Sequence, residues 1–459
     1  MIDSDTWWHL RTGQWIVEHR ALPAVDRFSF TRVGEEWHYP GWLAQIIMFA
    51  VYSFAGLAGL NAFFILIALL ACLLIYLTQR GDSFISGFAI VIAAASAAIY
   101  WTARPQLFTF LFGALYYLII WKYLKEGSRK LLWLLPLVMF FWVNMHGGFA
   151  VGFLLLIIAI LGQSLFIFLS PDRRNRKESD KILVLIGIGL VCLVAALCNP
   201  YGLEMLNYPF KTVSIQVLQS SIQEWQSPDF HLLNAQPFLW LLFLTWLVLS
   251  FSPIRPDPRD CLFLLVISYM GFLAWRNVPL LSIFAPSILS TYANPILVKV
   301  FPRWVSSREG TLLSRRINIF ILLIFLVTAA SSIYLSTSEK AIQDSIRRQL
   351  PVAAAEYLAR HPGMGPMLNS YNWGSYLLWR LPEEPVFVDG RTDVYDDELL
   401  SQYLTTVNAQ NGWRNTLTQW NIGLVFLEPT APLVQLLLLD GWRTEYQDAV
   451  AVILRAPAP

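Results

Sequence analysis

The sequence predicts a polytopic α-helical membrane protein with a small C-terminal α/β domain. Three observations support this fold class. Of the 459 residues, 56% are hydrophobic and 14% are charged, with a mean hydropathy of +0.51, whereas soluble domains carry roughly a quarter charged residues. Several apolar runs reach the ~20 residues needed to cross a bilayer. After residue 336, charged helical segments alternate with short apolar runs, a pattern typical of α/β domains.

Ten apolar segments are predicted to span the membrane. They cover residues 57–78, 83–100, 105–124, 130–146, 148–169, 182–198, 236–252, 261–275, 278–293 and 317–335. A run over 41–55 is too short to span comfortably, and we expect it to be an interfacial helix. The predicted organisation is a first outer loop over 1–56, a bundle over 57–336 and a soluble extracytoplasmic domain over 337–459.

Loop charges predict the orientation. Nearly all Lys and Arg residues between the spans fall in one set of loops, while the opposite loops hold only Arg104, Lys211 and Arg276. The positive-inside rule puts the basic set in the cytoplasm and both chain ends outside. An outer segment ahead of the first span is unusual, so we expect a further membrane helix upstream. The alternative is that 41–55 spans the membrane and residues 1–38 are cytoplasmic.

With this orientation, the unusual polar residues share the outer face. The N-terminal run Asp3-Ser4-Asp5-Thr6-Trp7-Trp8-His9 brings together two carboxylates, two indoles and an imidazole. Outer span ends and the long 203–235 loop add Arg104, Asn144, His146, Glu224, Trp225 and Arg276. Each of these alone fits a helix cap or an interface anchor, but together they can line one cavity that opens outward.

Each candidate has a chemical and a structural interpretation. Asp3 and Asp5 fit a general base or a metal site, or else a solvated turn or helix cap. Arg104 and Arg276 fit phosphate contacts, or else side chains that extend to the interface. His146 precedes two glycines, which allow close approach to a ligand or simply a tight turn.

The soluble end contains one further candidate pair. Asp389 and Arg391 follow the apolar run 385–388, and α/β sheets often place ligand contacts directly after a strand. A turn held by an Asp–Arg pair is the simpler interpretation, and we favour it. We therefore interpret the C-terminal part as an accessory domain.

Several function classes lack support. The net charge of +2 gives no indication of nucleic-acid binding. The four cysteines show no C-x-x-C spacing. The sequence contains no phosphate-binding P-loop, H-E-x-x-H site or nucleophile elbow, so ATP-driven pumping and most hydrolase chemistries are excluded for this chain.

The motifs together resemble the GT-C superfamily of membrane glycosyltransferases. They are D-x-D-x-W-W-H-L at the start, Trp37-His38-Tyr39-Pro40-Gly41-Trp42, N-x-H-G-G, N-P-Y-G, E-W and V-D-G-R. The resemblance implies inverting transfer of a sugar from a polyprenyl-phosphate donor to a lipid, glycan or protein acceptor. It also implies a bacterial inner-membrane protein, in contact with membrane lipids, whose reaction and C-terminal domain lie on the outer face.

The resemblance also implies roles for individual residues. Asp3 or Asp5 would deprotonate the acceptor, and the same pair would hold a divalent cation, Mg or Mn, if the reaction uses one. Trp7, Trp8 and Trp225 offer indole faces for the sugar, with His9 beside them, and Arg104 or Arg276 would neutralise the phosphate. Two other functions stay open: a transporter or flippase for lipid-linked glycans, and a non-enzymatic membrane protein whose C-terminal domain binds a ligand.

Overall fold

The computed structural model describes residues 3–170, 176–213, 222–300 and 337–457, together with isolated positions between these ranges. The predicted span over 317–335 lies largely outside the described residues. The chain divides into two units. Unit 1 comprises Met1–Ala62, Phe210–Ser220 and Leu335–Pro459, and unit 2 comprises Phe63–Pro209 and Ser221–Tyr334.

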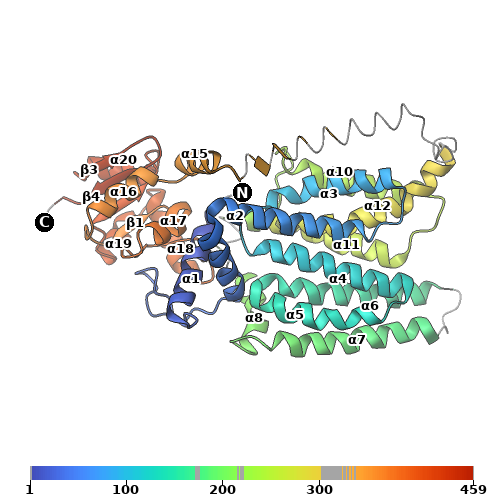
Figure 1. The fold of residues 1–459 in the computed structure, drawn as a ribbon. Coiled ribbons are helices and arrows are strands. Elements are labelled where there is room, and N and C mark those ends of the chain that lie inside the picture. Colours follow the sequence, from blue (N-terminus) through green and yellow to red (C-terminus); the bar gives the residue numbers. More distant parts are fainter. Residues whose placement is uncertain are drawn as a thin grey trace. The chain divides into compact units, whose positions relative to one another are not determined.

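Unit 2 is a bundle of apolar helices that run side by side (Figure 1). After the second half of α2 (Trp42–Tyr76), it contains α3 (Ser83–Ala97), α4 (Gln106–Glu126), α5 (Leu134–Met145), α6 (Ala150–Leu169), α7 (Arg176–Ala196), α10 (Gln236–Phe251), α11 (Pro258–Leu273) and α12 (Val278–Val300), with α8 (Glu204–Val213) at its boundary. Within the described residues, six helical segments are long and apolar enough to cross a membrane. The predicted polytopic α-helical class is confirmed.

A break at Gly56 divides α2 into two helices. Gly56 adopts φ +64° and ψ −163°, a backbone conformation that only glycine adopts without strain. The break separates the run predicted as an interfacial helix from the first predicted span. The interfacial location of the run over 41–55 stays a prediction.

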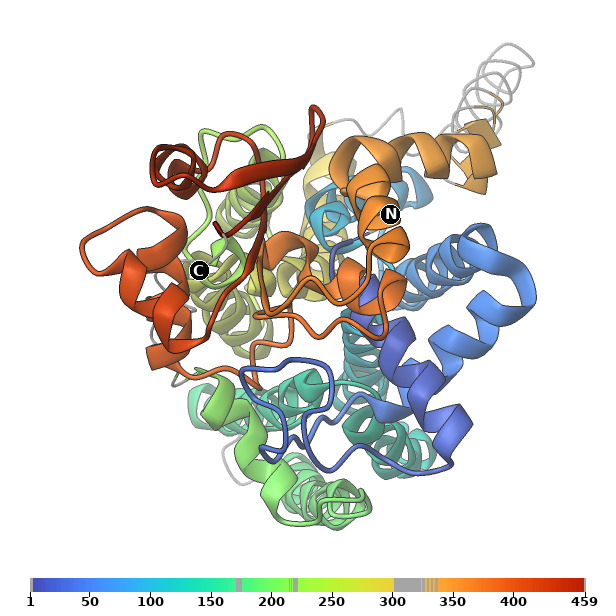
Figure 2. The ribbon, with the colours of Figure 1, turned by 90° about the vertical axis from the view of Figure 1, so that its left-hand side faces the viewer.

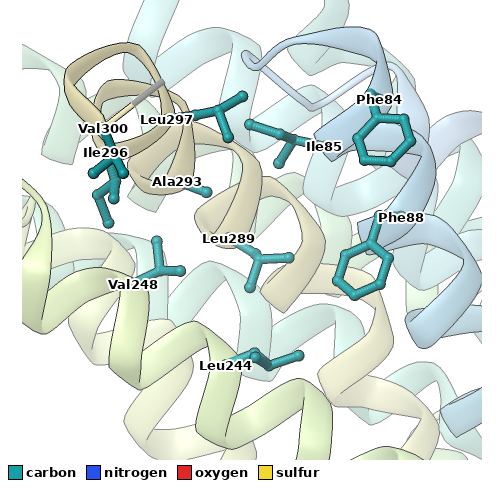
Figure 3. A pocket seen from close by; sticks show the side chains of 10 residues that line it. All are labelled: Phe84, Ile85, Phe88, Leu244, Val248, Leu289, Ala293, Ile296, Leu297 and Val300. Atoms are coloured by element: carbon teal, nitrogen blue, oxygen red, sulfur yellow. The ribbon is translucent and has the colours of Figure 1, made fainter. Parts of the chain in front are cut away.

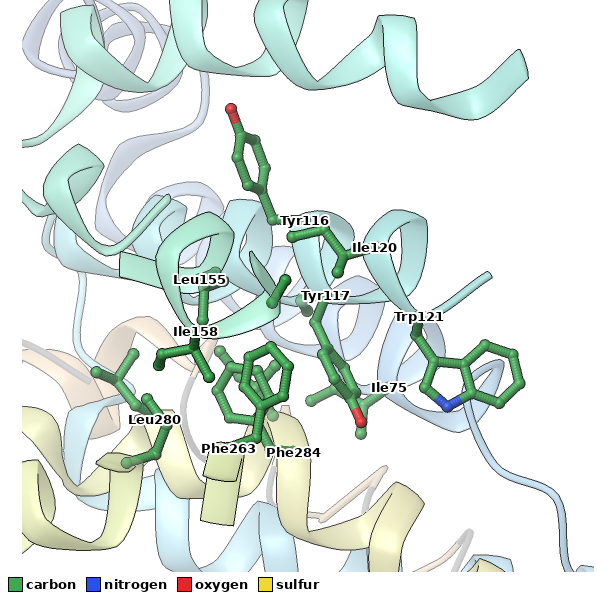
Figure 4. Close-up of a cluster of buried hydrophobic side chains, with 14 of the residues drawn as sticks. Ile75, Tyr116, Tyr117, Ile120, Trp121, Leu155, Ile158, Phe263, Leu280 and Phe284 are labelled. Carbon is green, nitrogen blue, oxygen red and sulfur yellow. The ribbon is translucent and has the colours of Figure 1, made fainter. Parts of the chain in front are cut away.

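The interior of unit 2 is built largely from aromatic and branched side chains (Figure 4). Phe284 packs edge-on against Tyr117, with ring centroids 4.6 Å apart, and stacks on Phe263 at 5.2 Å. Tyr116 is fully buried, and its hydroxyl donates to the carbonyl of Leu135 at 2.7 Å. The phenol therefore satisfies its hydrogen-bonding capacity inside the bundle.

A buried ionic network ties α4, α6 and α11 together. Lys125 Nζ lies 2.6 Å from Asp257 Oδ2 and 3.0 Å from Asp260 Oδ2. Arg259 contacts the same Asp257 oxygen at 2.6 Å and donates to Gln163 Oε1 at 3.1 Å. Because the acids and bases are matched, the network stabilises these helix ends without leaving a buried charge unpaired.

Unit 1 contains a small mixed sheet with helices around it. Its C-terminal elements are α15 (Glu339–Gln349), α16 (Val352–Arg360), β1 (Met367–Asn369), α17 (Tyr371–Arg380), α18 (Asp397–Val407), α19 (Trp413–Gln419), β2 (Leu424–Leu427), α20 (Pro432–Leu439), β3 (Arg443–Gln447) and β4 (Val452–Arg455). The strand order is β1-β2-β4-β3, with β1 and β2 parallel and the other pairs antiparallel. The predicted α/β character of this region is confirmed.

The N-terminal segment belongs to the same unit. Phe30 N–H donates to the carbonyl of Val386 at 3.1 Å, and Val386 N–H donates to the carbonyl of Phe28 at 3.2 Å. The Thr31 hydroxyl donates to the carbonyl of Phe387 at 2.7 Å. Figure 2 shows the dark-blue loop before α2 beside the orange C-terminal segment. Residues from both ends of the chain therefore share one folded unit, which also holds α1 (Thr6–His19).

Candidate functional site

The two N-terminal acids lie at the start of α1. Asp5 is the N-cap residue of α1, yet its side chain makes no capping hydrogen bond with that helix. Its N–H donates to Asp3 Oδ1 at 3.0 Å, while Asp3 N–H donates to the Thr6 hydroxyl at 3.3 Å. The Asp5 carboxylate lies against Gly390, because a Cβ built on that glycine would be 2.9 Å from Asp5 Cγ. Both acids are only partly exposed.

The aromatic residues after these acids face the interior of unit 1. Trp7 and Trp8 are 3% and 4% exposed. The Trp7 ring contacts Tyr376 edge-on at 5.2 Å, and the Trp8 ring contacts Tyr39 at 5.0 Å. Their indole N–H groups have no hydrogen-bond partner within the described part of the chain. Sugar stacking on these rings stays a prediction, since the described contacts are with protein side chains.

His9 is also buried, at 2% exposed. Its Nδ1 lies 3.4 Å from Gln45 Nε2 near the start of α2, and its ring lies over Trp8 with centroids 3.6 Å apart. The amide group can donate to the neutral imidazole. His9 therefore links α1 to α2 inside unit 1.

Asp389 and Arg391 form a buried ion pair, and Asp26 contacts the same guanidinium. Arg391 is fully buried and donates to Asp389 through both Nε and Nη2, the latter at 2.7 Å. Its Nη1 lies 2.5 Å from Asp26 Oδ1, and the Tyr395 hydroxyl donates to Asp389 Oδ2 at 2.7 Å. Burial raises the pKa of a carboxyl group, but the Arg391 guanidinium outweighs this effect and holds the pKa of Asp26 below its ordinary value. The pair holds a turn, which is the interpretation favoured above.

A third carboxylate lies near this network. The Trp37 indole N–H donates to Asp393 Oδ2 at 3.1 Å, and Trp37 also lies under the Arg391 guanidinium, 4.8 Å from its ring centroid. Burial raises the pKa of Asp393 to about 6, against the smaller opposing effects of the Trp37 hydrogen bond and the Arg391 charge. Asp393 therefore changes its charge near neutral pH.

Four predicted site residues come together in unit 2. Arg104 Nη1 contacts Glu224 Oε1 at 2.6 Å, although 120 residues separate them. The Arg276 guanidinium lies over the Trp225 ring, 4.0 Å from its centroid. Trp275 N–H donates to the carbonyl of Gln226 at 3.0 Å, which joins the 203–235 loop to the start of α12. Sequence reasoning missed Tyr100, whose hydroxyl interacts with Arg276.

His146 interacts electrostatically with Arg276 and Arg104. Its Nδ1 accepts a hydrogen bond from the N–H of Gly148, so the imidazole is neutral. The group contains the guanidinium groups of Arg104 and Arg276, and guanidinium groups suit an anion such as a phosphate.

Hydrogen bonds fix which nitrogen of His146 carries the proton. Nδ1 accepts from the N–H of Gly148 at 3.1 Å and lies 2.8 Å from the Thr109 hydroxyl. That hydroxyl accepts from the Trp142 indole at 2.9 Å, so its own proton is available for Nδ1. The ring proton consequently resides on Nε2, which becomes a hydrogen-bond donor. Thr109 was missed from the sequence because nothing local marks it.

Asn144 has a structural contact pattern. Its Nδ2 donates to the carbonyl of Phe140 at 2.8 Å and to the carbonyl of Cys198 at 3.0 Å. The amide thereby connects the end of α5 to the segment after α7. It holds the position of the neighbouring His146 turn.

An apolar groove of about 330 Å³ lies elsewhere in unit 2, between α3, α10 and α12 (Figure 3). Its lining is entirely apolar and consists of Phe84, Ile85, Phe88, Leu244, Val248, Leu289, Ala293, Ile296, Leu297 and Val300. No lining side chain can contact a phosphate or a sugar hydroxyl. The groove is therefore separate from the polar cluster around His146.

A metal ion that is bound by protein side chains alone usually takes several His, Cys, Asp or Glu ligands. Nowhere among the described residues do three such side chains gather closely enough to hold one. Asp3 and Asp5 supply two carboxylates, and a Mg²⁺ site that is completed by waters and substrate phosphates uses one or two. A divalent cation at this pair stays a prediction.

Solved structures resemble this chain along nearly its whole length. No family model matches the sequence, and no curated protein matches it. The oligosaccharyltransferase AglB of Archaeoglobus fulgidus, in complex with an inhibitory peptide and a dolichol-phosphate, superposes with a TM-score of 0.56 at 12% identity over 93% of this chain. ArnT of Cupriavidus metallidurans, bound to undecaprenyl phosphate, superposes with a TM-score of 0.53 at 13% identity over 100% of it. The chain has the GT-C fold.

The two matches differ in how much of the other protein they cover. This chain spans 65% of the AglB chain but 95% of the ArnT chain. The apo form of the Archaeoglobus fulgidus oligosaccharyltransferase gives a TM-score of 0.52 with the same 65% coverage. These matches confirm the GT-C fold that was expected from the short motifs. Because the sequence identities are 12–13%, the matches support the fold and no finer property.

Proposed function

We propose that this GT-C protein transfers a sugar from a polyprenyl-phosphate donor to an acceptor on the extracytoplasmic face of the bacterial inner membrane. The observation that carries the proposal is the cluster of Arg104, Glu224, Trp225, Arg276 and His146, in which two guanidinium groups from distant segments come together. An anionic lipid phosphate complements guanidinium groups. Support also comes from the fold, since AglB and ArnT were solved with dolichol-phosphate and undecaprenyl phosphate.

The proposed reaction is a single displacement. Asp5, with Asp3 beside it, takes the proton from the acceptor hydroxyl or amide. The acceptor then attacks the anomeric carbon while the bond to the phosphate oxygen breaks, which inverts the anomeric configuration. The negative charge that develops on the departing lipid phosphate is stabilised by Arg104 and Arg276, and the neutral His146 donates a hydrogen bond from Nε2.

The rival functions have weaker support. A ligand-binding C-terminal domain that uses Asp389 and Arg391 would need them exposed, but both are fully buried. A flippase would move the labelled lipid across the membrane without forming a glycosidic bond. It would also have no need for the two acids at the start of α1.

A transfer assay tests the proposal. The protein is reconstituted in liposomes with radiolabelled undecaprenyl-phosphate hexoses and an envelope extract as the acceptor source, and labelled product is measured. Asp3→Asn/Asp5→Asn should reduce transfer at least ~1,000-fold with unchanged folding, because the base is removed. Gly187→Ala is the matched control, since a Cβ there meets no atom within 4 Å. Normal turnover by the double variant would contradict the assignment of the base.

A further inference from the structure

The V-D-G-R turn of the C-terminal domain lies directly against Asp5. Gly390 is the central residue of this turn, and a Cβ at its position would collide with Asp5 Oδ1 and lie 3.1 Å from Ser375 Oγ. Gly390 is not among the glycines with positive φ. An alanine would therefore add bulk at this position without adding backbone strain.

The turn has little freedom to move away from such bulk. Asp389 Oδ1 accepts the N–H of Arg391 at 2.8 Å, and the Arg391 side chain bridges to Asp26 within a fully buried network. Gly390 N–H donates to Ser375 Oγ at 3.2 Å. These contacts keep the turn from shifting to make room for an added Cβ.

Helix α17 approaches the same turn from the other side. A Cβ at Gly374, in α17, would lie 2.7 Å from Asp389 Cα. The same helix contacts α1 through the Trp7–Tyr376 ring pair. Because α1 is held by α17 and α17 by the turn, the Asp5 carboxylate has a defined position on Gly390.

We infer that Gly390 is a positioning residue for Asp5. The C-terminal domain sets where the carboxylate of the first outer loop lies, and the missing Cβ provides the room it occupies. This inference rests on the proposed function, in which Asp5 is the general base. Displacing a reacting group by ~1 Å can cost about 100-fold in rate.

The test is Gly390→Ala in the intact protein, assayed for transfer as above. We expect kcat to fall about 100-fold while the KM for the lipid-linked donor stays within about two-fold. A purely structural defect would lower the amount of folded protein instead, leaving kcat per folded molecule unchanged. Gly187→Ala, measured in parallel, should match the parent protein.

A second measurement does not depend on activity. The thermal unfolding midpoint is compared for the parent, Gly390→Ala, Asp5→Ala and the double variant. Gly390→Ala should lower the midpoint clearly more in the parent than in the Asp5→Ala background, where the colliding carboxylate is gone and only the 3.1 Å contact with Ser375 Oγ remains. An equal shift in both backgrounds, or unchanged kcat in Gly390→Ala, overturns the inference. If transfer instead survives Asp3→Asn/Asp5→Asn, the proposed function itself fails.

Discussion

The buried guanidinium of Arg391 gives a quantitative prediction about what stabilises unit 1. Its side chain is 0% exposed and lies between two carboxylates, those of Asp26 and Asp389. Removing one partner from a buried ion pair costs about 3–5 kcal/mol, so Arg391→Met should lower the free energy of unfolding by about 4 kcal/mol at pH 7. Methionine fills much of the same volume, and the loss therefore reports mainly on charge.

The loss of unfolding free energy in Arg391→Met should depend on pH. The burial of the Asp26 carboxyl group sets the direction of this dependence. Without the guanidinium, burial raises the folded-state pKa of the Asp26 carboxyl group above its unfolded value. The folded variant then binds more protons than the unfolded chain, so its stability rises as the pH falls. One protonating carboxyl group recovers about 1.4 kcal/mol per pH unit, and the cost of Arg391→Met should fall to about 1.2 kcal/mol at pH 5. In the parent protein the pKa of Asp26 is held below its ordinary value, so its contribution is lost only at more acidic pH.

Urea unfolding of the intact protein in detergent micelles, followed by near-UV circular dichroism at pH 5 and pH 7, measures both quantities. Arg414→Met is the control, because the Arg414–Asp440 pair has side chains 65% and 33% exposed and should contribute less than about 1 kcal/mol. Adding Asp26→Asn to Arg391→Met should restore stability at pH 7 by removing one buried charge. A cost below about 1 kcal/mol, or one equal at both pH values, would refute the reasoning.

Three further predictions concern single contacts. Because burial raises the pKa of Asp393 to about 6, its ionisation costs stability as the pH rises from about 4 to 6; Asp393→Asn should raise the thermal unfolding midpoint at pH 8 and leave it unchanged at pH 4. His146→Gln should lower transfer roughly 10-fold without changing the shape of the pH–rate profile between pH 5 and 8, since His146 is neutral there; a lost limb would show that it titrates. A double-mutant cycle on the Arg104–Glu224 contact should give a coupling of about 1 kcal/mol in unfolding free energy; additive losses would show that the contact is not formed in solution.

The bundle could be predicted from the sequence because its determinants are local. Runs of about 20 apolar residues identify spans without any knowledge of tertiary contacts, and Gly56 marks the division of α2. The Asp389–Arg391 turn could also be predicted from the sequence, because its two partners are only two residues apart. Each of these signals lies within one segment.

The partners of the candidate residues could not be predicted from the sequence. Glu224 is 120 residues from Arg104, and Asp26 is 365 residues from Arg391. Neither pairing follows from spacing or periodicity in one sequence, since both depend on how loops meet after folding. Charge type suggested that such residues share a face, whereas the identity of each partner required the structure.

The buried Arg391 explains why the two ends of the chain form one unit with a defined register. Apolar contacts alone, such as those of Phe28 and Trp37, tolerate sliding, because one hydrophobic surface can replace another. A guanidinium shared by Asp26 and Asp389 does not tolerate it, since any shift would leave a buried charge without its partner. The network therefore acts more on specificity than on stability. Through it, a turn near the end of the sequence determines the geometry of the acids with which the sequence begins.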